Sequence, residues 1–191
     1  IITVIFITGI VSFFILNQPL KDRVYSAFTE TSDWISNGVP TAENSVISSA
    51  GLRFEMYASA IQKIEDVPFF GHGYRTSNII VFQDSKSYAG RLSYSFNHLH
   101  NAYLTNYYNG GIVLLGALLL LLFVPLILFI KANSQNRTNP VFIAGALLTV
   151  GYASFGMVNI LLGDTYMNGF YTFFLAIFML LYSQSVKISS T

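Results

Sequence analysis

An isolated arginine is the first residue in this sequence whose surroundings point to chemistry. Arg53 stands four residues before Tyr57 in the stretch Arg53-Phe-Glu-Met-Tyr57. A guanidinium presents a fixed fork of donors, which suits an anionic group such as a phosphate. The alternative is that Arg53 forms a salt bridge with Glu55, Asp66 or another acid of the same region.

Histidines supply the second candidate, in the run His98-Leu-His100-Asn101. The unperturbed pKa of an imidazole lies near working pH, so His100 is a candidate general base. The alternative is an imidazole that bonds to backbone. On an extended segment His98 and His100 share a face, and with His72 they could bind a metal. Three histidines in a chain without cysteine are a weak ligand set, so we predict no metal site.

Two glycines follow a proline in Pro68-Phe-Phe-Gly71-His72-Gly73. This pattern predicts a tight turn or a close approach of two backbones. It is too short for a nucleotide-binding motif.

The elements that carry these residues are predicted from hydropathy. Of the 191 residues, 53% are hydrophobic and only 10% are charged, and crossing a bilayer takes about 20 apolar residues. We therefore predict an all-α integral membrane protein, polytopic, with a large and mainly helical extracytoplasmic loop. The predicted transmembrane helices cover 111–130, 141–163 and 167–182. Residues 1–16 are predicted to be the end of a truncated transmembrane helix, so we expect the C-terminal part of a longer protein.

Basic residues near the spans predict the orientation. Lys131 and Arg137 lie in the link 131–140, which has no acid, and Lys187 lies in the tail 183–191. The link and the tail are therefore predicted to be cytoplasmic. The loop 17–110 and the short turn 164–166 are then extracytoplasmic.

Within the loop, the clearest helix is predicted from about Ser48 to Asp66, ending before Pro68 because the residue before a proline disfavours helix. Its apolar residues repeat at helical spacing and predict one buried face, made of Phe54, Tyr57, Ala58, Ile61 and Ile64. A second, shorter helix is predicted over Asp22–Ile35. Between the two helices, residues 37–49 are predicted to form a turn, and 77–96 give no clear prediction.

Taken together, the three motifs resemble the O-antigen ligase/polymerase family, whose members are bacterial polytopic enzymes acting on lipid-linked glycans at the outer face of the cytoplasmic membrane. The resemblance runs from about Ser49 to Gly116 and rests on the order and spacing of Arg53-x-x-x-Tyr57, Pro68-x-x-Gly71-x-Gly73 and His98-x-His100-Asn101. It implies that Arg53 binds the pyrophosphate of the donor and that His100 activates the acceptor hydroxyl. The remaining motif residues would bind substrate: Tyr57, Gly71, Gly73, His98 and Asn101.

The sequence departs from the family pattern in two places. The ligases usually show G-x-x-G after this His-Asn motif, whereas here Gly111 is followed by Leu114 and then Gly116. The family's second donor-binding arginine, in a Ser-Arg motif, has no match in this sequence.

The resemblance implies a glycosyltransferase of lipopolysaccharide biosynthesis in the bacterial inner (cytoplasmic) membrane. It would transfer a glycan from undecaprenyl pyrophosphate to a lipid A-core sugar hydroxyl in the periplasm, without a cofactor. Its partners would be this donor, a lipid A-core or glycan acceptor and the lipid bilayer. The net charge of +1 gives no reason to expect nucleic acid.

Several other functions remain open from the sequence. An O-antigen polymerase would join lipid-linked repeat units, and a protein O-oligosaccharyltransferase would glycosylate protein. A non-catalytic membrane scaffold or a transporter fragment belongs to a different class. A transporter should show ionisable or broken-helix features at mid-membrane, and the predicted spans show none.

Overall fold

The computed structural model describes residues 17–37, 49–135, 139–163 and 165–189, and every regular element among them is a helix. In chain order these are α2 (Gln18–Asn37), α3 (Ser49–Gln62), the 3-10 turn η1 (Ile64–Asp66), α4 (Ser77–Phe82), α5 (Tyr88–Tyr94), α6 (Ala102–Gln135), α7 (Pro140–Phe155) and α8 (Thr165–Ser189). The predicted helix at 1–16, most of the turn predicted at 37–49, Arg137 and position 164 lie outside the described residues.

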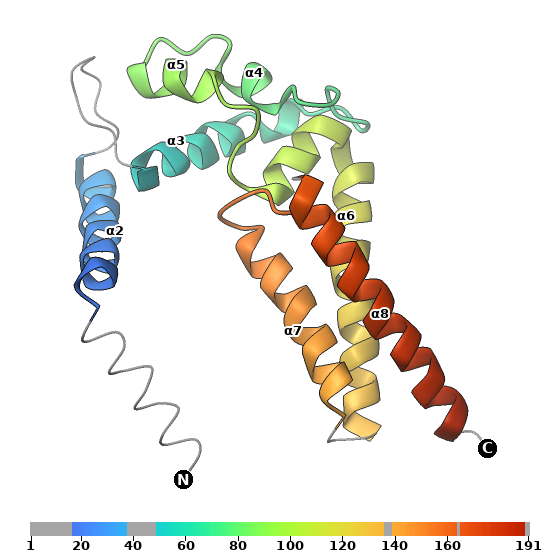
Figure 1. The fold of residues 1–191 in the computed structure, drawn as a ribbon. Helices are drawn as coiled ribbons and strands as arrows, with labels where there is room; N and C mark the ends of the chain where they lie inside the picture. The colour runs from blue at the N-terminus through green and yellow to red at the C-terminus, as the bar shows by residue number, and fades with distance from the viewer. Residues whose placement is uncertain (1–16, 38–48, 136–138, 164, 190–191) are drawn as a thin grey trace.

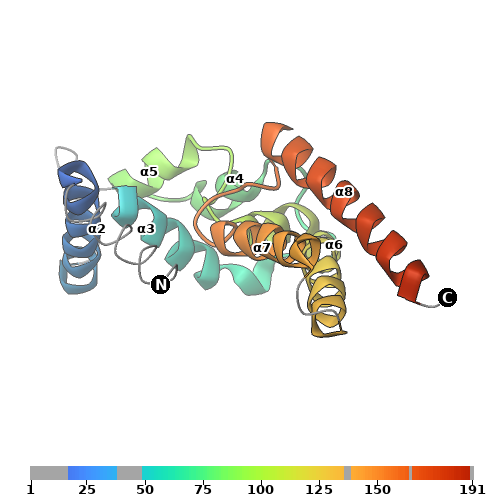
Figure 2. The same cartoon turned by 60° about the horizontal axis from the view of Figure 1, so that its bottom comes forward.

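Two groups of helices build the molecule (Figure 1). The helices α6, α7 and α8 run side by side, and α3, α4 and α5 lie across one end of them. Figures 1 and 2 both show α2 beside α3 and away from α7 and α8. The connection between α7 and α8 lies at the end that faces α3 to α5.

Among the described residues, two helices are long and apolar enough to cross a membrane: Ala102–Ala132 within α6 and Thr165–Gln184 within α8. The all-α prediction is confirmed for this part of the chain. Within α6, the backbone leaves helical geometry at Gly110 and Gly111. Helical geometry resumes at Ile112, within the span predicted over 111–130.

The helix predicted over 141–163 is shorter than expected. α7 has 16 residues, which rise only about 24 Å, less than the roughly 30 Å of a hydrocarbon core. Directly after its last residue, the carbonyl of Gly156 accepts a hydrogen bond of 2.7 Å from the N–H of Ala102 at the start of α6. Residues 156–163 then form an irregular connection to α8.

The buried face predicted for α3 is only partly correct: Tyr57 packs against the core, but the fully buried residues of the helix are not the predicted ones. Met56 and Ala60 are fully buried, whereas Ile61 is 58% exposed. The reason is that α3 packs against two neighbours. Phe54 stacks on Trp34 of α2 with ring centroids 5.0 Å apart. The opposite side of the helix joins the core formed by Met56, Ala60, Val81, Phe82, Leu99 and Tyr108.

Candidate active site

The turn 68–73 forms backbone hydrogen bonds with α6 at the kink of that helix. A kink interrupts the hydrogen bonds of a helix and leaves carbonyls without helical partners. Two backbone bonds of 2.9 Å from the turn supply those partners, His72 N to Tyr108 O and Gly73 N to Asn109 O. Backbone hydrogen bonds therefore fix the position of the turn relative to the start of α6.

Gly71 is required by this close approach. Its φ is +69°, and a Cβ at this position would lie 2.5 Å from the backbone nitrogens of Gly110 and Gly111. Gly73, with φ at +108°, follows in the same turn. Their predicted substrate-binding role thus has a competing explanation in backbone packing, and neither is among the residues that line the cavity described below.

The histidine motif lies in the turn between α5 and α6, where its backbone is held from two sides. The Tyr57 hydroxyl donates a 2.7 Å hydrogen bond to the His100 carbonyl. Asn101 uses both ends of its amide: Oδ1 accepts from the N–H of Leu104 at 3.0 Å, which caps α6, and Nδ2 donates to the Met157 carbonyl at 3.1 Å. Tyr57 and Asn101, predicted to bind substrate, are therefore positioned to hold His100 in place.

The two histidines of the motif are in different hydrogen-bonding states. Their ring centroids are 4.4 Å apart, and Nδ1 of His98 accepts a 3.2 Å hydrogen bond from the backbone N–H of His100. A neutral His98 must then carry its proton on Nε2, which leaves it no free lone pair. Nδ1 of His100 is buried and has no hydrogen-bond partner among the described residues. Of the two, His100 is the imidazole that can accept a proton.

The surroundings of His100 keep its imidazole neutral. Burial lowers the pKa of His100 most, the charge of Arg53 and any positive charge on His98 lower it further, and a side-chain interaction with Asn159 raises it. The net direction is downward from the ordinary value of 6.5. At neutral pH the ring is therefore unprotonated, as a general base requires.

Arg53 reaches this site from α3. Its charge acts on both His100 and Tyr57, and its Nε is buried with no hydrogen-bond partner in the part of the chain that the structure describes. The alternative of a salt bridge with Glu55 is not what the structure shows. Glu55 accepts a 3.5 Å hydrogen bond from Ser59, and burial raises the pKa of its carboxyl.

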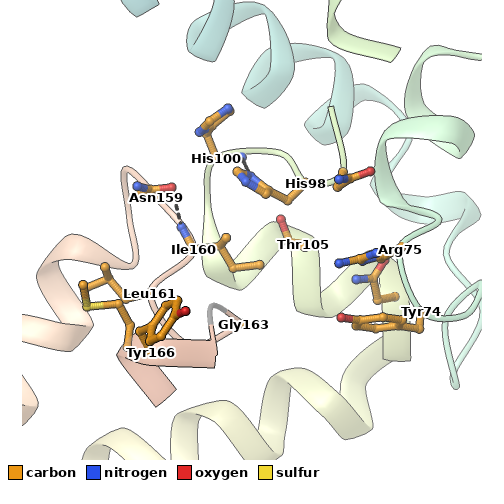
Figure 3. Close-up of a pocket in the computed structure, with 13 residues that line it drawn as sticks. Tyr74, Arg75, His98, His100, Thr105, Asn159, Ile160, Leu161, Gly163 and Tyr166 are labelled. Carbon is orange, nitrogen blue, oxygen red and sulfur yellow. Dashed lines mark hydrogen bonds between the residues drawn. The ribbon is translucent and has the colours of Figure 1, made fainter. Parts of the chain in front are cut away.

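A cavity of about 700 Å³ opens beside the two histidines (Figure 3). Its walls come from the turn 73–76, the histidine motif, the start of α6 and the connection between α7 and α8. The lining residues are Tyr74, Arg75, Asn97, His98, His100, Thr105, Asn109, Asn159, Ile160, Leu161, Gly163, Tyr166 and Met167. None of these residues carries a carboxylate, so the described lining suits an anion or a polar neutral group.

His72 stands apart from the other two histidines and stacks on Tyr108, with ring centroids 6.3 Å apart. In the described part of the chain, no group of three or more potential metal ligands comes together. The three histidines named in the sequence as a possible ligand set are therefore not assembled into one.

Two lining residues of this cavity, Arg75 and Asn159, were not predicted from the sequence. Arg75 directly follows the Gly71-x-Gly73 turn, and that position was its only signal. Asn159 falls in a stretch predicted to span the membrane, so nothing marked it. Among the described residues, the non-glycine residues with positive φ are Arg75 at 61° and His100 at 49°, and both line the cavity. Such conformations concentrate at functional sites.

Comparison with known proteins agrees with the resemblance read from the motifs. A family profile described as O-antigen ligase matches residues 1–119. A protein of Haemophilus influenzae described as uncharacterized is 32% identical over 113 residues, which cover 58% of this chain and 28% of that protein. The chain thus spans little more than a quarter of the relative's length. No solved structure matches it.

Proposed function

Because the chain belongs to the O-antigen ligase family, we propose that it carries the catalytic loop of a membrane glycosyltransferase. In this proposal the donor is a glycan on undecaprenyl pyrophosphate and the acceptor is a sugar hydroxyl of a lipid A core. The observation that carries the proposal is the buried Nδ1 of His100, which has no hydrogen-bond partner among the described residues, in an environment where burial and the charge of Arg53 lower the pKa of the imidazole.

The reaction that these residues support is a displacement at the anomeric carbon of the donor. The acceptor hydroxyl oxygen forms the new bond to that carbon, and the bond to the pyrophosphate oxygen breaks. His100 takes the hydroxyl proton, and undecaprenyl pyrophosphate leaves with the electron pair. Arg53 binds the pyrophosphate and stabilises the negative charge that grows on it.

Undecaprenyl pyrophosphate is already a good leaving group. The proposed step therefore requires charge stabilisation and proton removal but no Lewis acid. We therefore propose a metal-independent transfer. Activity of the purified protein should survive EDTA, and a loss that one divalent ion restores would refute this part.

The proposed location is the periplasmic face of a bacterial inner membrane, with several spans. The support is the pattern of basic residues in the link 131–140 and the apolar helices α6 and α8. A reporter fused near Lys86 should register as periplasmic and one near Ser134 as cytoplasmic. The reverse pattern would place the cavity in the wrong compartment for a flipped lipid-linked donor.

The deciding experiment deletes the gene for the full-length protein and analyses the lipid-linked glycans. If long polymer accumulates on its lipid carrier and the lipid A core stays bare, the protein is a ligase. If single repeat units accumulate or are transferred instead, the protein is the polymerase of the same family. Unchanged glycans would refute both.

A further inference from the structure

The turn 73–76 is held at both ends by one residue of α6, Asn109. Asn109 accepts from Gly73 N through its backbone carbonyl at 2.9 Å and from Ser77 N through Oδ1 at 3.1 Å. Within the turn, the Thr76 hydroxyl donates to the Gly73 carbonyl at 2.7 Å. These bonds anchor a segment whose backbone contains a left-handed arginine, Arg75, at φ 61°.

This turn presents a cation and an aromatic ring to the cavity. The guanidinium carbon of Arg75 lies 5.4 Å from the centre of the Tyr74 ring, which is within the range of a cation–π contact. Tyr74 itself is 77% exposed. Arg75 is exposed and the described lining holds no carboxylate, so an anionic ligand in the cavity would meet a cation and no competing negative side chain there.

The remaining walls suit a sugar. In Figure 3, Arg75 and Tyr74 lie on one side, Tyr166 and Asn159 lie on the other, and Thr105 lies between them. Tyr166, which is 85% exposed, contributes a second aromatic ring to the lining. The volume of about 700 Å³ falls within the roughly 300–1,000 Å³ of small-molecule sites.

Arg75 and Arg53 occupy different positions relative to the cavity. Arg53 acts on His100 from α3 and is not part of the cavity lining, whereas Arg75 is. If Arg53 holds the pyrophosphate of the donor, then the group that gives its proton to His100 must arrive from the cavity. That group belongs to the acceptor.

We infer that Arg75 and Tyr74 form an acceptor subsite that binds an anionic substituent, a phosphate or a carboxylate, on the acceptor glycan. This rests on the proposed transferase function and adds to it a specificity for charged acceptors. Arg75 has no role in the chemical step. Its fork of donors selects and orients the acceptor so that the attacking hydroxyl lies at His100.

The test measures transfer by the full-length purified protein to rough lipopolysaccharide from a strain deleted for it. The acceptor is used intact, after phosphatase treatment, or with its carboxylates converted to methyl esters. For the wild type, one of the two treatments should raise the acceptor KM about 10- to 100-fold, the range for losing a charge-assisted hydrogen bond. That treatment identifies the anion.

The variant Arg75→Gln should raise the KM of the intact acceptor by a similar factor and add nothing further on the treated acceptor, with kcat and the donor KM unchanged. Arg75→Gly, which also relieves the positive φ, should do the same. Arg23→Gln removes an equal charge from an exposed position of α2 and should behave as wild type.

Two kinds of result would overturn the inference. One is an Arg75→Gln variant whose acceptor KM is unchanged, or whose loss is equal on intact and treated acceptors. The other is a rise in the donor KM, which would assign Arg75 to the pyrophosphate. Absence of any transfer by the wild type would instead refute the proposed function, so the two failures are distinguishable.

Discussion

Replacing Tyr57 by Phe separates positioning of the base from substrate binding. The variant keeps the ring that packs beside the core of α3 and removes the hydroxyl that donates 2.7 Å to the His100 carbonyl. The same hydroxyl lies 3.2 Å from the Met157 carbonyl, but it has one proton, so one bond is lost. His100 is then held in its left-handed conformation by fewer contacts.

The size of the effect follows from the bond. A neutral hydrogen bond contributes about 0.5–1.5 kcal/mol, and leaving its acceptor unsatisfied raises the cost to roughly 1–3 kcal/mol. If that free energy is lost from the alignment of His100, the rate falls about 5- to 150-fold at 1.36 kcal/mol per tenfold. The fall should appear in kcat, because a misaligned base slows proton transfer without weakening the donor complex.

Steady-state transfer by the full-length enzyme measures this, with donor and acceptor varied in turn. Tyr25→Phe is the matched control, because Tyr25 is 73% exposed on α2 and lies outside the site. A Tyr57→Phe enzyme with normal kcat would refute the positioning role. A variant with normal kcat and a raised donor or acceptor KM would restore the role predicted from the sequence, direct contact with substrate.

Three further outcomes are expected. His100→Ala should lower kcat about 10²- to 10⁴-fold. His98→Ala should lower kcat less, because Nδ1 of His98 already accepts a hydrogen bond from a backbone N–H. Equal or reversed losses in the membrane-inserted variants would contradict the assignment of His100 as the base. The acid limb of kcat/KM should lie below the ordinary histidine pKa, since the pKa of His100 is lowered and activity is lost only as pH falls through it. Arg53→Gln removes a nearby cation and should therefore move the acid limb of the residual activity to higher pH. Arg53→Lys keeps the charge, so the acid limb should stay in place while donor binding still fails. An acid limb that does not move in Arg53→Gln would refute the effect of the Arg53 charge on the pKa of His100. Gly71→Ala should reduce the yield of folded protein, because its Cβ would meet the backbone of α6 at 2.5 Å, and a normally folded variant by thermal melting would refute this close approach.

Local patterns predicted much of the positioning framework. The start of the apolar span after Gly111, the helix before Pro68 and the close approach at Gly71 all depend on residues within a few positions of one another. The buried face of α3 depends on which neighbours pack against it. Periodicity places Phe54 and Ile61 on one stripe, but it cannot show that Phe54 packs against Trp34 of α2 whereas Ile61 stays 58% exposed among the described residues.

The candidate site was predicted only where its residues share a motif. Arg53 and His100 come from separate motifs, and the structure brings their charges into interaction. Arg75 and Asn159 have no motif of their own, because an arginine after a turn and an asparagine in an apolar stretch each have common structural uses. Only the three-dimensional arrangement places both on one cavity.

The early end of α7 is what completes this cavity. Had the helix continued through residue 163, as hydropathy predicted, the segment after Phe155 could not meet the histidine motif. Instead Gly156 and Met157 use their carbonyls to hold Ala102 and Asn101, and Asn159 follows into the lining, where it raises the pKa of His100 against the effect of burial. The family match stops at residue 119, so part of the environment of His100, the proposed base, comes from sequence beyond the matched region. The matched motifs supply His100 and its neighbouring cation, while residues 156–167 shape one wall of the space through which an acceptor would reach it.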